Sequence, residues 1–271
     1  MLEDPRGRID YDEEGSGPTI LFVPGSWATR SAWRGVIAAM GGRFRTVTTS
    51  LLGYGGTEER RTATDASIER QAEIVEAVVR HTRGAVHFIG HSYGGLVCLA
   101  VAIRGIAPLA SLTVVEAVAF GLLRHTGQAG DLALYQQFIT VRDAYFRAFE
   151  DGDKEAARAV VDYLGGGGSF DALPPRMRDY IVATTPTHVL DIRSGFDAPL
   201  SAFADISLPS LVVRGEHGIP AVARSAEVLS SSLPNASLVT VAGARHFIMA
   251  THAGELARLI GDHVSKAASP V

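Results

Sequence analysis

Cysteine is nearly absent from this chain of 271 residues, which contains only Cys98. A single cysteine excludes an intrachain disulfide and any metal site built from several thiolates. Cys98 lies within an apolar stretch, so we expect it to pack as a small hydrophobic side chain. This cysteine usage is typical of a reducing compartment, and we therefore expect a cytoplasmic protein.

The chain also lacks an excess of positive charge and a long uninterrupted apolar run. Its 25 Lys and Arg against 29 Asp and Glu give a formal net charge of −4, whereas nucleic-acid binding is driven by basic surfaces. The most apolar region, residues 94–115, is interrupted by Arg104 and Pro108, which indicates a buried helix and strand rather than a membrane span. The N-terminus is polar and lacks the apolar centre of a signal peptide. We expect no nucleic-acid partner and no membrane association, and the oligomeric state stays open.

The remaining composition is ordinary for a soluble protein with a sizeable core, since 46% of the residues are hydrophobic and 20% are charged. Short apolar runs that end at Gly or Pro alternate with helical patterns over residues 1–118 and again over 206–271. Such alternation is typical of parallel βαβ units. Residues 119–205 carry helical patterns and no convincing strand. We therefore predict an α/β core of residues 1–118 and 206–271, interrupted by a helical cap of residues 119–205.

The most informative motif is Gly-His-Ser-Tyr-Gly at positions 90–94. An apolar strand at 86–89 leads into it, and an apolar helix at 96–103 follows it. A nucleophile elbow needs this context, because the serine sits on a strained strand-to-helix turn where only glycine fits on either side. The motif therefore predicts that Ser92 is a nucleophile.

A serine hydroxyl becomes a good nucleophile when a base takes its proton and a third group orients that base. In this topology the chain order is serine, acid and histidine, with the histidine on a loop after the last strand. His246 occupies that place, because it follows an apolar strand at 237–241 and a glycine turn, and precedes a helical pattern at 253–266. His246 is therefore the expected base.

The whole chain resembles the α/β-hydrolase fold superfamily, in the serine esterase and carbon–carbon hydrolase branch that carries a helical cap. Besides the elbow, the resemblance rests on Phe-Val-Pro-Gly-Ser-Trp at 22–27, Gly-Tyr-Gly-Gly-Thr at 53–57, Leu-Val-Val-Arg-Gly-Glu at 211–216 and Gly-Ala-Arg-His-Phe at 243–247. It implies a mostly parallel central sheet flanked by helices, with the cap inserted after the strand that ends near Glu116. It also implies hydrolysis that needs no metal and no organic cofactor.

The acid departs from the usual pattern of this superfamily. Most members carry an aspartate where this chain has Gly218, three residues after the glycine that ends the preceding strand. Some related hydrolases and dehalogenases place the acid after the strand that follows the nucleophile helix, which is where Glu116 lies. A buried unpaired carboxylate is costly, which favours Glu116 as the group that orients His246. Glu216 and Asp197 remain alternatives.

The resemblance also implies an oxyanion hole formed by the backbone N–H groups of Ser26 and Tyr93. Trp27 and Tyr54 are candidates for lining the substrate pocket, although each could equally belong to the core, and His217 is a further pocket candidate. Aromatic side chains of the predicted cap suggest an apolar roof or a core of the cap itself. They are Phe120, Tyr135, Phe138, Tyr145, Phe146 and Phe149.

These features predict a serine hydrolase that cleaves a carboxylic ester of a small, mostly apolar substrate through an acyl-enzyme on Ser92. A serine nucleophile argues against haloalkane dehalogenase or epoxide hydrolase chemistry, which uses a carboxylate nucleophile in this fold. Carbon–carbon bond hydrolysis, lactonase and perhydrolase activities share the same three residues and stay open. The missing aspartate at Gly218 also leaves open a catalytically weak homologue that binds a ligand.

Overall fold

A computed structural model describes residues 1–5 and 7–268 of the chain. At its centre lies a seven-stranded sheet with the order β3-β5-β4-β6-β7-β8-β9. Only β3 is antiparallel to its neighbour, so the predicted mostly parallel sheet is confirmed. The strands of this sheet are β3 (Tyr11–Glu14), β4 (Thr19–Val23), β5 (Arg45–Thr49), β6 (Val86–His91), β7 (Leu109–Val115), β8 (Ser210–Gly215) and β9 (Ala236–Val241). A separate antiparallel pair consists of β1 (Leu2–Asp4) and β2 (Gly7–Ile9).

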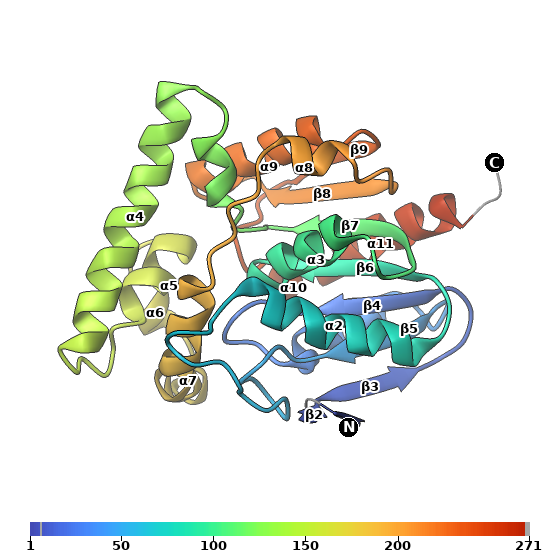
Figure 1. Cartoon of the computed structure of the whole chain (residues 1–271), viewed down its shortest axis with the longest axis horizontal. Coiled ribbons are helices and arrows are strands. Elements are labelled where there is room, and N and C mark those ends of the chain that lie inside the picture. Colours follow the sequence, from blue (N-terminus) through green and yellow to red (C-terminus); the bar gives the residue numbers. More distant parts are fainter. Residues whose placement is uncertain (6, 269–271) are drawn as a thin grey trace.

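Helices cover both faces of this sheet (Figure 1). Along β4, Leu21 and Val23 belong to one buried apolar cluster, whereas Ile20 and Phe22 belong to another on the opposite face. Successive side chains of a strand point to opposite faces, so a strand that is apolar throughout is stable only when both faces are covered. The first cluster includes α2 (Ile68–Thr82), α3 (Tyr93–Arg104) and α9 (Pro220–Ser232), and the second includes α1 (Arg34–Ala39), α10 (Ile248–Thr251) and α11 (Ala253–Ala267).

The chain between β7 and β8 forms a helical segment, residues 119–205, that lies beside the carboxyl ends of the parallel strands (Figure 1). Part of it has an apolar cluster of its own, centred on Tyr145, Val161 and Phe170. Its elements are the 3-10 helix η2 (Phe120–Arg124) and the α-helices α4 (Ala129–Glu150), α5 (Arg158–Gly165), α6 (Ser169–Ala172), α7 (Pro175–Arg193) and α8 (Ser201–Ala204). Within the described part of the chain, every helix is too short or too polar to cross a bilayer.

Candidate active site

Ser92 lies at a sharp turn between β6 and α3, with φ of 54° and ψ of −123°. A non-glycine residue in this conformation is strained by about 1–3 kcal/mol, so the surrounding packing must hold it. A Cβ atom on Gly90 would lie 2.5 Å from the carbonyl oxygen of Gly94, and one on Gly94 would lie 2.2 Å from that of Pro24. Side chains at either glycine are therefore excluded, and the turn packs directly on the loop that follows β4.

His246 connects Ser92 to Glu116. Its Nε2 lies 3.0 Å from Ser92 Oγ, and its Nδ1 lies 3.2 Å from Glu116 Oε2. Because an ionised carboxylate only accepts hydrogen bonds, the arrangement assigns the ring proton to Nδ1 and leaves Nε2 to accept from the serine hydroxyl. All three side chains are buried. The serine, the acid and the histidine, which are far apart in the sequence, therefore form one continuous line of hydrogen bonds.

Glu116 directly follows β7, the strand that pairs with β6, so it lies next to Ser92. The backbone continues the sheet at this point, because Ser92 N–H donates to the Val115 carbonyl at 3.0 Å and Glu116 N–H donates to the Val213 carbonyl at 2.8 Å. Glu116 Oε1 accepts from the N–H of Gly215 at 2.6 Å, while Oε2 faces the imidazole. Both oxygens of this buried carboxylate thus have a hydrogen-bond donor, which offsets much of the cost of its burial.

The two alternative acids have other partners. Glu216 is half exposed and accepts from the N–H of Gly243 at 2.8 Å. Asp197 pairs with Arg124 at 2.5 Å and with His125 at 2.6 Å. Of the three carboxylates that the sequence offers, Glu116 is the one placed against the histidine ring.

His91, inside the elbow, fixes the backbone of the histidine loop. Its Nε2 donates to the carbonyl oxygen of His246 at 2.9 Å, which requires the proton on Nε2. Burial, together with the nearby His246 ring, lowers the pKa of His91 to about 3. His91 therefore stays neutral at physiological pH and connects the turn that carries Ser92 to the loop that carries His246.

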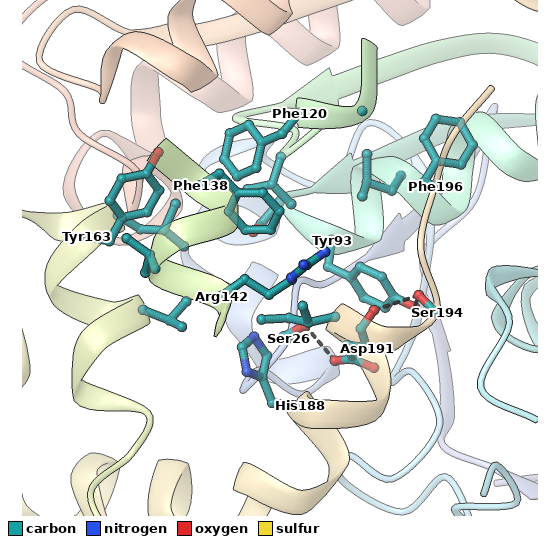
Figure 2. Close-up of a pocket in the computed structure, with 18 of the residues that line it drawn as sticks. Ser26, Tyr93, Phe120, Phe138, Arg142, Tyr163, His188, Asp191, Ser194 and Phe196 are labelled. Atoms are coloured by element: carbon teal, nitrogen blue, oxygen red, sulfur yellow. Dashed lines mark hydrogen bonds between the residues drawn. The ribbon is translucent and has the colours of Figure 1, made fainter. Parts of the chain in front are cut away.

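The two residues expected to form an oxyanion hole flank Ser92. Tyr93 is the next residue and begins α3, and Ser26 follows Gly25, whose Cβ position would lie 2.9 Å from Ser92 Cβ. Each side chain is hydrogen-bonded to a residue at the C-terminal end of α7. Ser26 Oγ donates to Asp191 Oδ2 at 2.5 Å, and Tyr93 Oη lies 2.8 Å from Ser194 Oγ (Figure 2).

A cavity of about 270 Å³ is lined by Ser92 and His246 together with residues of the helical segment. Phe120, Phe138 and Tyr163 form one side of it, and Ser26 and Tyr93 lie on the other (Figure 2). Trp27 and Tyr135 also line it. Of the six aromatic residues named from the sequence, the other three, Tyr145, Phe146 and Phe149, pack in the separate apolar cluster. The cavity wall is therefore mostly apolar, and Ser92 and His246 are among its polar lining residues.

Residues 20–259 match the sequence profile of the alpha/beta hydrolase family. This chain belongs to that family. The arrangement of the sheet and the position of Ser92 after β6 agree with the match.

Several relatives resemble this alpha/beta hydrolase. It is 24% identical over 256 residues to a 2-(acetamidomethylene)succinate hydrolase of Mesorhizobium japonicum, covering 89% of this chain and 87% of that protein. It is 34% identical over 105 residues to haloalkane dehalogenase 2 of Mycobacterium tuberculosis. That match covers 38% of this chain and spans 36% of the dehalogenase, about a third of its length. A solved structure of a thermophilic esterase from Thermogutta terrifontis superposes with a TM-score of 0.76 at 20% identity, covering 98% of this chain and 97% of the esterase, which shows a shared fold.

Two pocket predictions for this alpha/beta hydrolase need correction, because neither Tyr54 nor His217 is among the residues that line the cavity. Tyr54 is fully buried behind the cavity wall, where its hydroxyl donates to Asp191 Oδ2 at 2.7 Å. His217 is 55% exposed on the loop after β8, and its backbone N–H is bonded to the Ala244 carbonyl at 2.9 Å. The hydrogen bond of Tyr54 directs its hydroxyl to Asp191, and the side chain of His217 is largely exposed.

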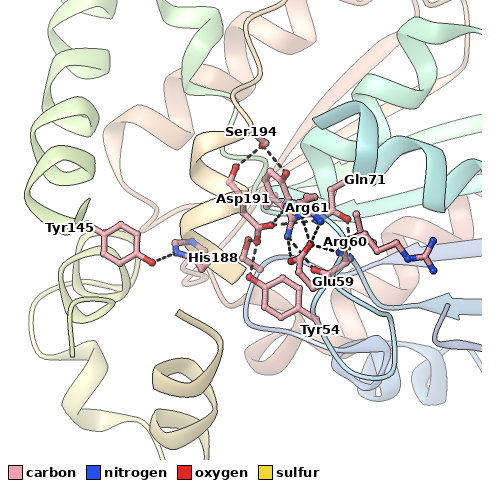
Figure 3. A network of polar contacts seen from close by, with 12 residues as sticks. Tyr54, Glu59, Arg60, Arg61, Gln71, Tyr145, His188, Asp191 and Ser194 are labelled. Atoms are coloured by element: carbon pink, nitrogen blue, oxygen red, sulfur yellow. Dashed lines mark hydrogen bonds and ion pairs between the residues drawn. The ribbon is translucent and has the colours of Figure 1, made fainter. Parts of the chain in front are cut away.

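A buried ionic network beside the cavity was not predicted from the sequence. Asp191 of α7 lies 2.7 Å from Arg61, which also pairs with Glu59 at 2.7 Å (Figure 3). Burial raises the pKa of Asp191, while Arg61 and the hydrogen bonds from Ser26 and Tyr54 act in the opposite direction. No local motif marks these residues, because Arg61 and Asp191 are 130 positions apart. The network joins the helical segment to the core immediately behind Ser26.

His188, one turn before Asp191 on α7, lies against the loop after β4, which carries Ser26 and Trp27. Its ring stacks on Trp27 with a centroid separation of 3.6 Å, and its Nδ1 lies 3.0 Å from the hydroxyl oxygen of Tyr145. Burial, reinforced by the charge of Arg61, lowers the pKa of His188 to about 3. The ring is therefore neutral and acts as an aromatic contact between α7 and the loop after β4.

Proposed function

We propose that this alpha/beta hydrolase cleaves the carboxylic ester of a small, mostly apolar substrate through an acyl-enzyme on Ser92. The observation that carries the proposal is the line of hydrogen bonds from Ser92 through His246 to Glu116, two of whose members, Ser92 and His246, line a mostly apolar cavity. The likeness to the Thermogutta terrifontis esterase is compatible with it at the level of the fold.

The first half of the reaction forms the acyl-enzyme. Ser92 Oγ attacks the ester carbonyl carbon while His246 Nε2 takes the hydroxyl proton. The imidazolium that results is stabilised by Glu116, whose Oε2 accepts from Nδ1. The negatively charged oxygen of the tetrahedral intermediate accepts hydrogen bonds from the backbone N–H groups of Ser26 and Tyr93. One such donor lowers the free energy of the transition state by about 2.7–4 kcal/mol.

The second half regenerates the enzyme. When the intermediate collapses, the carbon–oxygen bond to the alcohol breaks and His246 protonates the leaving alcohol. A water molecule then gives a proton to His246 and attacks the acyl carbon, which breaks the ester bond to Ser92. His246 returns its proton to the serine oxygen, and the carboxylic acid leaves.

Dehalogenation is a weaker proposal despite the partial match to haloalkane dehalogenase 2. Displacement of a halide by Ser92 would leave an alkyl ether on the enzyme. Water activated by a histidine does not hydrolyse an alkyl ether, whereas it does hydrolyse the ester of an acyl-enzyme. The serine at this position therefore favours acyl transfer, which carbon–carbon, lactone and perhydrolase substrates would also use.

We place this activity in the cytoplasm, since Cys98, the only cysteine in the sequence, is a buried free thiol. The substrate is proposed to be a small molecule because the cavity of about 270 Å³ suits one.

Pre-steady-state kinetics with p-nitrophenyl esters test the proposal. We expect a burst of nitrophenol equal to the concentration of enzyme, because acylation of Ser92 releases the alcohol before water attacks. The Ser92→Ala variant, folded as judged by circular dichroism, should show neither burst nor turnover. Turnover that persists in this variant would contradict the proposal. A panel that includes lactones and a diketone then identifies the preferred class of substrate.

A further inference from the structure

The C-terminal end of α7, together with Ser194 directly after it, contacts both residues expected to form the oxyanion hole. Asp191 Oδ2 accepts from Ser26 Oγ at 2.5 Å, and the Ser194 hydroxyl lies 2.8 Å from Tyr93 Oη (Figure 2). The two contacts are linked, because Ser194 Oγ donates to the backbone carbonyl of Asp191 at 2.5 Å (Figure 3). The Tyr93 hydroxyl consequently donates to Ser194 Oγ. The helical segment thus holds two core loops that come from different strands.

We propose that Asp191 is a positioning residue for the oxyanion hole, and that Ser194 helps to position the other half of the hole through its hydrogen bond with Tyr93. Asp191 fixes Ser26 through its hydroxyl, so that the backbone N–H of the same residue faces the oxygen of the tetrahedral intermediate. This inference rests on the proposed function. It assigns the helical segment a part in the chemical step, in addition to its part in forming the cavity.

The loop after β4 needs such a constraint. Trp27, the residue after Ser26, has φ of 57°, a left-handed conformation that a bulky side chain adopts only under strain. A strained loop that had no external contact would relax, and its N–H groups would turn with it. Asp191 is paired with the Arg61 guanidinium at 2.7 Å. A hydrogen bond to a carboxylate in such an ion pair is stronger than one between neutral groups, which suits the contact with Ser26 to hold this conformation.

Asp191 is itself firmly held. Arg61, whose side chain is fully buried, lies 2.7 Å from its Oδ1, and Tyr54 donates to its Oδ2 at 2.7 Å. Arg61 also donates to the Leu52 carbonyl at 3.2 Å, so the guanidinium is tied to the core. The Asp191 carboxylate is therefore fixed relative to the core, and it restricts the movement of the Ser26 side chain. A contact needed only to attach α7 could be apolar, since a buried ion pair adds little net stability.

The test compares Asp191→Asn and Ser26→Ala with the wild-type enzyme in kcat, in KM and in the affinity for a boronic acid. A boronic acid forms a tetrahedral adduct on Ser92 and therefore reports on the oxyanion hole without turnover. We expect kcat to fall by about 10- to 100-fold in each variant, the loss typical of misplaced groups. KM should change little, and the boronate affinity should fall in parallel with kcat/KM. Ser26→Thr, which keeps the hydroxyl, should restore most of the rate.

The double variant adds a check on the mechanism. Because Asp191 and Ser26 act through one hydrogen bond, their double variant should be no slower than the worse of the single variants. Glu150→Gln is the matched control. Glu150 is an exposed carboxylate that pairs with Arg193 of α7 at 3.1 Å and lies outside the cavity lining, so its variant should keep the wild-type kcat.

The outcomes separate this inference from the proposed function. If turnover depends on Ser92 but Ser26→Ala keeps the wild-type kcat and boronate affinity, the positioning role is wrong and the proposed function stands. A rise in KM alone, with kcat and boronate affinity unchanged, also overturns it, because that result describes a binding role. Should Asp191→Asn fail to fold, Ser26→Ala decides the question, since it leaves the contacts of Asp191 with Arg61 and Tyr54 in place.

Discussion

A Cβ atom on Gly218 would lie 3.5 Å from both carboxylate oxygens of Glu116. Gly218 stands where most α/β-hydrolases carry their aspartate, so the usual acid position and the carboxylate of Glu116 occupy neighbouring space beside His246. The two residues follow β7 and β8, which are paired in the sheet. A carboxylate from either strand end can therefore reach the same imidazole nitrogen, and the acid can change strands without any change in the histidine loop.

Replacing Glu116 with Gln should lower kcat by about 10⁴, the effect known for the equivalent change in a serine protease triad. The amide keeps the shape of the side chain but can donate to Nδ1, which favours the wrong tautomer of His246. Steady-state hydrolysis of a nitrophenyl ester measures the loss. Glu216→Gln is the control, since that half-exposed carboxylate contacts Gly243 and should be dispensable. Near-normal turnover of Glu116→Gln would contradict the assignment of the acid.

The proximity of Gly218 predicts that the acid can be moved back. Glu116→Ala should be nearly inactive, and adding Gly218→Asp should raise its kcat by about tenfold or more, because a carboxylate again reaches the histidine. Glu116→Ala with Gly218→Asn is the matched control, which offers similar bulk without charge. If the asparagine variant recovers as much rate as the aspartate variant, the two positions are not equivalent.

The buried ring of His188 predicts a loss of stability in acid. Its pKa is lowered from 6.5 to about 3, first by burial and then by Arg61. Below about pH 6.5 the unfolded chain therefore binds a proton that the folded protein excludes, and the free energy of unfolding falls by about 1.4 kcal/mol per pH unit toward pH 3 for this one group. Glutamine does not bind a proton in this pH range. The free energy of unfolding of the His188→Gln variant should therefore fall less steeply with decreasing pH than that of the wild-type protein.

Urea unfolding of the wild-type protein and His188→Gln, between about pH 7 and pH 4, measures the two slopes. His91 is also kept neutral by burial, so both proteins share its contribution and the difference belongs to His188. Parallel curves of stability against pH would show that the ring at position 188 accepts a proton in the folded protein.

The parts of the site that depend on short-range patterns could be predicted from the sequence. The glycines at 90 and 94 mark the elbow because their Cβ positions are blocked by backbone atoms. His246 follows from its place after the last strand, and Glu116 follows from a carboxylate at the end of an apolar strand. Each of these features is visible in a few neighbouring residues.

The contacts between distant segments could not be predicted in this way. Asp191 is an acidic residue on a helix with no motif around it, and its partners Ser26 and Arg61 lie 165 and 130 positions away. The same network explains why Tyr54 does not line the cavity as expected, because its hydroxyl donates a hydrogen bond to the buried carboxylate of Asp191. His217 shows the corresponding limit for loops, since the sequence does not reveal whether a loop side chain faces the cavity or, as here, is exposed.

Labelling with a fluorophosphonate, followed by mass spectrometry of the peptides, tests the central claim most directly. The account predicts one modified residue, Ser92, in the folded wild-type protein, no label in Ser92→Ala, and much slower labelling in His246→Gln. A folded wild-type protein that stays unlabelled, or one that carries the label on another residue, would contradict it.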